Sequence, residues 1–136
     1  MRQETIIRPC EISDYPALKS FDEFVGDRRI DMQHGTLVVA EMQGGVVGYA
    51  KVAPSDFLGW PLLSIVCVAA AVRGQGIGGD LIAGVVKDRK WLRLYSTTEA
   101  SNVIMRSLLK KHGACEVGFA DGLNISEERE ILFRLK

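Results

Sequence analysis

Cysteine is scarce in this chain, and the pattern of the three that occur excludes two kinds of protein. Cys10, Cys67 and Cys115 are far apart and odd in number, and no two of them form a CxxC pair. This pattern argues against a disulfide framework and offers no spacing typical of a metal site. We therefore expect three buried, reduced thiols in a cytoplasmic protein without a bound metal.

The chain also lacks an excess of charge of either sign and a long apolar segment. Lysine plus arginine and aspartate plus glutamate number 17 each, so no overall field attracts nucleic acid or an anionic membrane. No apolar run approaches the roughly 20 residues of a membrane-spanning helix, and the first residues lack the apolar core of a signal peptide. With 136 residues, of which 47% are hydrophobic, the sequence predicts one globular domain, residues 1–136.

Apolar periodicity predicts a mixed α/β (α+β) fold. Alternating or continuous apolar runs predict strands at 5–8, 36–41, 46–53, 62–68, 91–96, 115–120 and 131–136. Apolar spacings of three and four predict helices at 13–25, 76–90 and 101–112, with a loop or short helix at 26–35 and a loop at 54–61. This order predicts a mostly antiparallel sheet with flanking helices, built around a central parallel strand–helix–strand crossover over residues 62–96.

The densest glycine cluster lies between the central strand and the helix that follows it. The segment reads Arg73, Gly74, Gln75, Gly76, Ile77, Gly78, Gly79. A strand, a glycine turn and a helix N-terminus leave backbone N–H groups free at the positive end of the helix dipole. The segment therefore predicts a site for a phosphate-bearing ligand, and Arg73 adds a positive charge beside it.

One interpretation of these glycines is a dinucleotide site. Gly74, Gly76 and Gly79 match the GxGxxG fingerprint, and Glu99 lies 20 residues further on, where a ribose-binding acid would sit. Against this interpretation, the strands before the motif form a hairpin, and only 57 residues follow it. This hypothesis requires that the chain bind NADH.

The other interpretation is a resemblance to a family. The segment from Arg73 to Gly78 resembles the R/Q-x-x-G-x-G/A signature of the GNAT family of N-acetyltransferases. The strand before it ends at Val68, five residues before Arg73, and Asn102 precedes Gly113 by eleven residues, both as in that family. The order of elements agrees from residue 5 to residue 136. The resemblance implies the GNAT fold, an acetyltransferase activity and acetyl-CoA as the co-substrate.

The resemblance also implies which residues hold acetyl-CoA. Backbone groups of the central strand would meet the pantetheine arm, and those of the glycine turn would surround the pyrophosphate. The expected set is Val66, Cys67, Val68, Arg73, Gly74, Gln75, Gly76, Ile77, Gly78, Gly79 and Asn102.

The catalytic groups depart from the family pattern. Leu109 stands where many members carry the tyrosine that protonates the leaving thiolate, and Ala114 stands where an aromatic residue usually follows the glycine. Direct attack of a neutral amine on the thioester, in a ternary complex, still needs a proton acceptor and a backbone N–H near Val68 for the oxyanion. The candidates for proton transfer are Tyr95, Ser64 and Glu99. Ser96 and His112 are two further candidates.

The acceptor site is the part that the sequence determines least. Residues 22–27 and Asp31 fall where the family's acceptor loop lies, and their acids would attract a cationic amine. Phe57, Trp60 and Pro61 would wall an acceptor pocket, join two copies in a homodimer or form an edge of the core. The expected partner is a small-molecule or peptide amine. If Leu109 marks a loss of transfer, the chain is instead an acyl-CoA-binding regulatory or sensor module.

Overall fold

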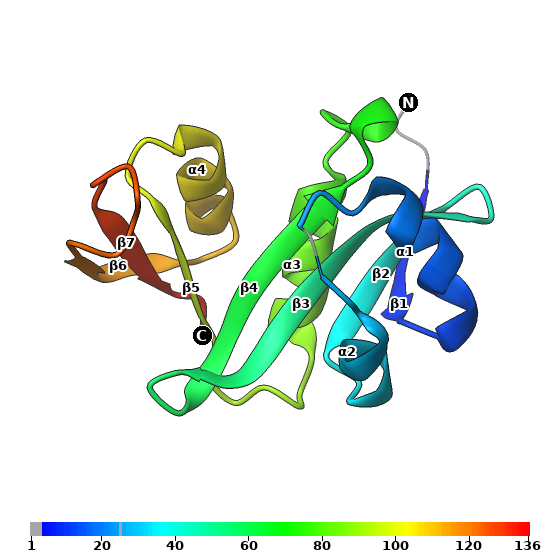
Figure 1. Ribbon diagram of the computed structural model, residues 1–136, viewed down its shortest axis with the longest axis horizontal. Coiled ribbons are helices and arrows are strands. Elements are labelled where there is room, and N and C mark those ends of the chain that lie inside the picture. The colour runs from blue at the N-terminus through cyan, green and yellow to red at the C-terminus, as the bar shows by residue number, and fades with distance from the viewer. Residues whose placement is uncertain (1–3, 25) are drawn as a thin grey trace.

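Residues 4–24 and 26–136 are described by the computed structural model of the chain, and their strands form one sheet (Figure 1). The strands are β1 (Thr5–Pro9), β2 (Leu37–Met42), β3 (Gly45–Phe57), β4 (Trp60–Val68), β5 (Tyr95–Glu99), β6 (Cys115–Ala120) and β7 (Glu130–Arg134). Their spatial order is β1-β2-β3-β4-β5-β7-β6; β4 and β5 are parallel, and the other neighbours are antiparallel. The predicted fold class is confirmed.

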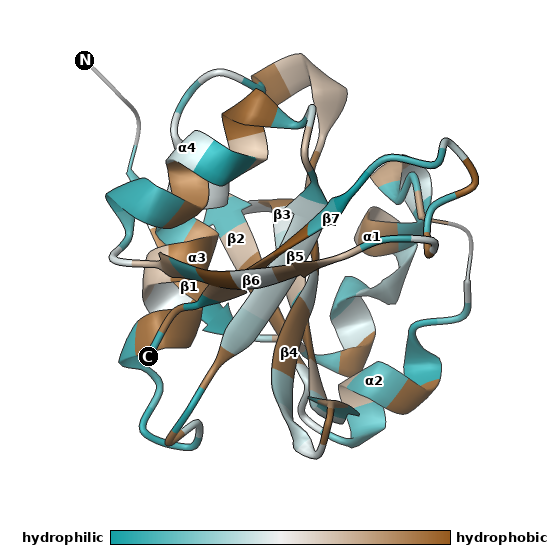
Figure 2. Ribbon diagram, turned by 90° about the vertical axis from the view of Figure 1, so that its left-hand side faces the viewer, coloured by the Kyte–Doolittle hydropathy of each residue, from teal (hydrophilic) through white to brown (hydrophobic). Residues whose placement is uncertain are grey.

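Helices cover both faces of the sheet (Figure 2). Helices α1 (Tyr15–Phe21) and α2 (Arg29–Gln33) lie on one side, and α3 (Ile77–Lys87) and α4 (Val103–Lys111) lie on the other. Two short 3-10 turns, η1 (Ile12–Asp14) and η2 (Ala70–Val72), precede α1 and α3. The smaller core cluster joins α1 and α2 to the sheet through Leu18, Met32, Leu37, Val39, Tyr49 and Cys67. The larger cluster packs α3 and α4 on the other face and includes Leu63, Leu81, Ile82, Val85, Leu109 and Phe133.

Strands β4 and β5 pair over a very short length. Their register contains Leu62 opposite Tyr95 and Leu63 opposite Ser96, and the ladder ends there. Beyond this point the two ribbons diverge (Figure 1). On its other side, β4 stays paired with β3 as far as Val68. One edge of the second half of β4 therefore has no strand beside it among the described residues.

A β-bulge lies where β4 leaves β5. Lys51 pairs with Ile65 and Val52 pairs with Leu63, so Ser64 is an extra residue on β4. A bulge bends its strand and increases its twist. The bend helps β4 to turn away from β5.

Several predicted element boundaries are wrong. The first helix ends at Phe21, because Asp22 is extended (φ −64°, ψ 114°), so Phe24 is not helical, and Val25 lies outside the described residues. The predicted loop at 54–61 is mostly strand, since β3 continues to Phe57 and β4 begins at Trp60. The strand predicted at 91–96 is β5, which begins at Tyr95 and ends at Glu99.

The remaining differences are smaller. The central helix ends at Lys87 rather than at residue 90, and the last strand ends at Arg134. Of the two options for residues 26–35, the short helix α2 is the one that forms. All three cysteines are free, but Cys115 is exposed on β6 and Cys10 is half-buried, so the expectation of three buried thiols is wrong for these two.

Gly84 is the point where α3 packs most closely on β1. A Cβ added there would lie 2.7 Å from Cγ2 of Ile7, which is too close for real atoms. We predict that Gly84→Ala lowers the free energy of unfolding by about 1–3 kcal/mol through overpacking. In a protein that already carries Ile7→Ala, Gly84→Ala should raise the free energy of unfolding by up to about 1 kcal/mol, because alanine favours the helix more than glycine does. Urea denaturation of the four proteins measures both values, and additive effects would contradict the prediction.

Candidate active site

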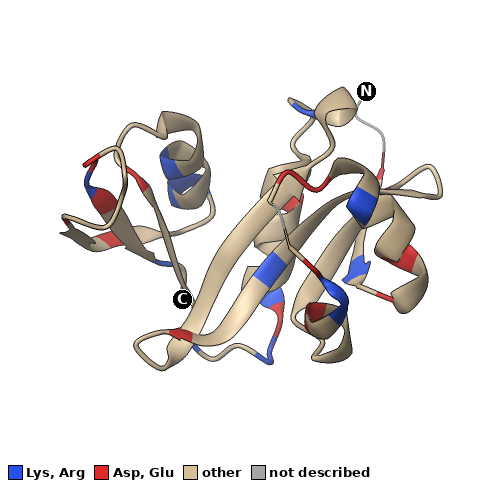
Figure 3. Cartoon of the chain, in the orientation of Figure 1, with Lys and Arg blue, Asp and Glu red and all other residues tan. Residues whose placement is uncertain are grey.

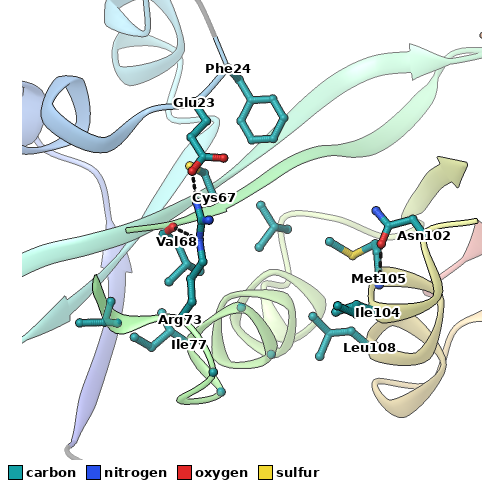
Figure 4. Close-up of a pocket in the computed structure, with 16 residues that line it drawn as sticks. Glu23, Phe24, Cys67, Val68, Arg73, Ile77, Asn102, Ile104, Met105 and Leu108 are labelled. Atoms are coloured by element: carbon teal, nitrogen blue, oxygen red, sulfur yellow. Dashed lines mark hydrogen bonds and ion pairs between the residues drawn. The ribbon is translucent and has the colours of Figure 1, made fainter. Parts of the chain in front are cut away.

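A cavity of about 710 Å³ lies between the end of β4 and the start of α4, the helix that follows β5 (Figure 4). Its lining joins four parts of the chain: the segment after α1, the second half of β4, the glycine turn and the first turns of α4. The lining residues are Glu23, Phe24, Val66, Cys67, Val68, Val72, Arg73, Gly74, Gly76, Ile77, Gly78, Gly79, Asn102, Ile104, Met105 and Leu108. Of the residues expected to hold acetyl-CoA, all but Gln75 therefore line one cavity.

The glycine turn delivers backbone N–H groups to this cavity. Gly74 and Gly76 both have a φ of +82°, a left-handed conformation that favours glycine. Gly76 is the N-cap of α3, and its carbonyl accepts the first helical hydrogen bond, from Asp80. The N–H groups of the first turn have no partner within the helix. The turn thus has the geometry of an anion site at a helix N-terminus.

Arg73 lines the cavity and contacts two other parts of the site. Its Nε donates a hydrogen bond to the carbonyl oxygen of Val68 at 3.0 Å. A terminal nitrogen of the same guanidinium forms an ion pair with Glu23, from the segment after α1 (Figure 4). The one arginine therefore links the glycine turn to β4 and to the α1–α2 segment.

The start of α4 forms the opposite wall. Asn102 is the N-cap, and its side-chain oxygen accepts a hydrogen bond from the backbone N–H of Met105 at 3.1 Å. Ile104, Met105 and Leu108 add an apolar surface to this wall. The helix predicted at 101–112 is confirmed as α4, with Asn102 as its N-cap.

A buried hydrogen-bond network fixes the segment that carries Glu23. The carboxylate of Asp22 accepts hydrogen bonds from Tyr49 Oη (2.6 Å), from Arg28 Nε (3.1 Å) and from the backbone N–H of Phe24 (3.0 Å). Burial, and then the hydrogen bond to Asp22, raise the pKa of Tyr49 well above its usual value, so its hydroxyl remains a donor. No sequence pattern predicts this network, because its members come from separate elements.

The residues proposed for proton transfer lie outside the cavity lining. Tyr95 stacks on Phe57, with ring centroids 4.5 Å apart. Ser64 is the bulged residue, and its Oγ donates to the carbonyl of Lys51 at 3.4 Å. Glu99 ends β5, three residues before Asn102; a hydrogen bond with the carboxyl group of Glu128 raises its pKa.

The other candidates have structural surroundings. Ser96 is buried and its hydroxyl donates to the carbonyl of Leu63 at 2.8 Å. His112 lies against the start of α3, since a Cβ at Gly79 would come within 2.9 Å of its Nε2. Leu109 is fully buried in the larger core cluster.

The predicted acceptor segment is divided by the structure. Glu23 and the half-exposed Phe24 line the cavity, whereas Asp27 forms an ion pair with Arg29 at 2.5 Å and Asp31 faces Lys51 at 3.4 Å. This segment carries both acidic and basic residues (Figure 3). Trp60, at the far end of β4, lies under the guanidinium of Arg93, 4.7 Å from its ring centroid.

Within residues 4–24 and 26–136, no cluster of His, Cys, Asp and Glu side chains has the arrangement of a metal site. No helix in this part of the chain is long and apolar enough to span a membrane.

Comparison with known proteins identifies the family. The family model of the acetyltransferase (GNAT) domain matches residues 33–113, more than half of the chain. The chain therefore belongs to the GNAT acetyltransferase family, whose general chemistry is acetyl-CoA-dependent N-acetyl transfer. A comparison with curated proteins gave no match.

Solved structures agree with this assignment over nearly the whole chain. A GNAT-family acetyltransferase from Bacillus cereus has a TM-score of 0.86 at 20% identity, covering 98% of this chain and 97% of that one. A ribosomal-protein-alanine N-acetyltransferase from Brucella melitensis has a TM-score of 0.77 at 27% identity, covering 95% and 98%. A diaminobutyrate acetyltransferase from Paenibacillus lautus, solved with L-2,4-diaminobutyric acid and coenzyme A, has a TM-score of 0.71 at 20% identity, covering 96% and 95%.

The hydroxyl of Tyr49 should be a major contributor to the stability of the Asp22 network. We predict that Tyr49→Phe lowers the free energy of unfolding by about 1.5–3 kcal/mol, the usual value of a hydrogen bond to a charged group. Tyr95→Phe is the matched control, because the Tyr95 hydroxyl has only a long 3.5 Å contact with Arg93. Urea denaturation compares the two variants, and equal losses would contradict the prediction.

Proposed function

We propose that this chain transfers an acetyl group from acetyl-CoA to a primary amine by direct attack in a ternary complex. The observation that carries the proposal is the single cavity in which the unpaired edge of β4 meets the glycine turn. Its volume of about 710 Å³ suits a ligand arm and a second small group. Acetyl-CoA supplies the thioester.

Each part of the cavity then has a role. The backbone of Val66, Cys67 and Val68 would pair with the amides of the pantetheine arm, as an added strand would. The first-turn N–H groups of α3 would bind the pyrophosphate. Asn102 keeps its amide nitrogen for the arm while its oxygen caps α4. A backbone N–H of β4 near Val68 would stabilise the oxyanion that forms when the amine attacks.

The attacking amine needs a base, and we propose Glu99, which ends β5 three residues before the Asn102 cap, for this role. The amine must lose a proton to attack, and a carboxylate with a raised pKa accepts protons nearer to neutral pH. A hydrogen bond with Glu128 raises the pKa of Glu99. The carboxylate of Glu128 also accepts a hydrogen bond from the backbone N–H of Ser101 at 2.7 Å. Tyr95 and Ser64 remain the other proposed groups, and the leaving thiolate would take its proton from water.

The acceptor is a small-molecule or peptide amine. The similar structures include one named for a ribosomal-protein alanine and one solved with diaminobutyric acid, so both classes occur on this fold. We also propose a cytoplasmic location, since the nearly neutral chain carries free thiols. A homodimer remains part of this proposal.

One observation favours a second function. Leu109 occupies the usual tyrosine position and is fully buried, so it supplies packing and no proton. A chain that binds an acyl-CoA without efficient transfer would be a sensor or regulatory module.

The first prediction from the proposed function concerns the binding of acetyl-CoA. Gly78 lines the cavity without a left-handed φ, and a Cβ there would meet Leu108 at an ordinary 3.6 Å, so side chains are accepted. We predict that Gly78→Asp weakens binding at least about tenfold more than Gly78→Asn, because the two have the same shape and differ in charge beside the pyrophosphate. Isothermal titration calorimetry measures both constants. Equal weakening would contradict a pyrophosphate at this turn, and binding of NADH in place of acetyl-CoA would favour the dinucleotide hypothesis.

Turnover separates the enzyme from the sensor. We expect that a panel of primary amines, containing diamines, amino acids and peptides with different N-termini, includes at least one that releases free thiol above the rate of hydrolysis. Thiol release is followed with a chromogenic disulfide, and the acetylated product is confirmed by mass spectrometry. Binding of acetyl-CoA without acetylation of any amine would favour the sensor.

A further inference from the structure

The ion pair between Arg73 and Glu23 lies on the side of the cavity that faces α4 (Figure 4). Arg73 belongs to the glycine turn and Glu23 to the segment after α1, 50 residues apart in the chain. The two side chains are 49% and 54% exposed. Exposed pairs of this kind contribute little to stability, so a better partner can replace either member.

A pyrophosphate in the cavity would be such a partner for Arg73. It carries more negative charge than one carboxylate, and a guanidinium can donate two parallel hydrogen bonds to phosphate oxygens. The bond from Arg73 Nε to the Val68 carbonyl keeps the guanidinium beside the glycine turn. The exchange therefore requires a small movement of one side chain.

Glu23 would stay at the cavity rim after Arg73 left it. Its neighbour Asp22 is held by Tyr49, Arg28 and the backbone of Phe24, none of which involves Arg73. The position of this backbone is therefore independent of the ion pair. The carboxylate of Glu23 would then face the cavity without its arginine.

The two arginines that follow Glu23 in the chain already have carboxylate partners. Arg28 holds Asp22, and Arg29 holds Asp27. A freed Glu23 would line the cavity with its carboxylate, where a cationic ligand could pair with it. Phe24, 46% exposed beside it, offers an apolar surface to the carbon chain of such a ligand.

We propose that Arg73 changes partner from Glu23 to the pyrophosphate when acetyl-CoA binds, and that the freed Glu23 carboxylate receives the ammonium group of the acceptor. The inference rests on the proposed function and deepens it, because it makes Glu23 a specificity-determining residue for a cationic amine.

Glu23→Gln tests both halves of the proposal, with Asp27→Asn as the matched control on the same segment. Calorimetry should show acetyl-CoA binding about two- to fivefold tighter in Glu23→Gln, because Arg73 no longer has to leave a carboxylate. Probe amines, 1,4-diaminobutane and a peptide with an N-terminal alanine, are then titrated into protein saturated with coenzyme A. The amine that binds more tightly to the wild type should bind to Glu23→Gln at least about tenfold more weakly than to the wild type. Asp27→Asn should change neither constant by more than about twofold.

Glu23→Gln should bind acetyl-CoA more tightly and the amine more weakly. A variant that only disturbed the segment around residue 23 would bind both ligands more weakly. An acetyl-CoA constant that is unchanged or weaker in Glu23→Gln would overturn the exchange. Equal amine binding by wild type and Glu23→Gln, or no amine binding by either, would overturn the role of Glu23. Failure of the wild type to bind acetyl-CoA would show instead that the proposed function is wrong.

Discussion

The short pairing of β4 with β5 is the constraint on which the site depends. Two residue pairs join these strands, and the ladder on the other side of β4 continues to Val68. The sheet thus remains continuous while one strand edge is left for a ligand. The same divergence separates the glycine turn from the start of α4, so that the two become facing walls. A longer parallel ladder would close this space and remove both the edge and the cavity.

Local chemistry explains which features could be predicted from the sequence. The glycine turn, the helix at 101–112 and most of the strands each follow from local sequence patterns, and the structure confirms them. The predictions failed where distant residues decide the outcome. The first helix ends at Phe21 because Asp22 binds Tyr49, 27 residues away. The Ser64 bulge is likewise set by the pairing of β4 with β3.

The site combines rigid and exchangeable charges within a few residues. Asp22 is held by three donors and by burial, so removing one donor leaves a charge with fewer partners in a poorly hydrated place. Glu23 is paired once and is half exposed. Adjacent carboxylates therefore have different roles, one in fixing the backbone and one in contact with the cavity. Asp22 and Glu23 carry the same charge, so their burial and their hydrogen-bond partners make the difference.

Gly76 and Gly78 have different reasons to be glycine. Gly76 has a φ of +82°, which any side chain would strain, whereas Gly78 is helical and has room for a Cβ. This difference matches the signature that the segment resembles, in which the first of the two positions is glycine and the second is glycine or alanine. A methyl group at the second position costs the backbone nothing and improves helix propensity. On the proposed function, the pyrophosphate would occupy the space of a larger side chain at Gly78. The backbone would then require the first glycine, and the ligand would limit the size of the second residue.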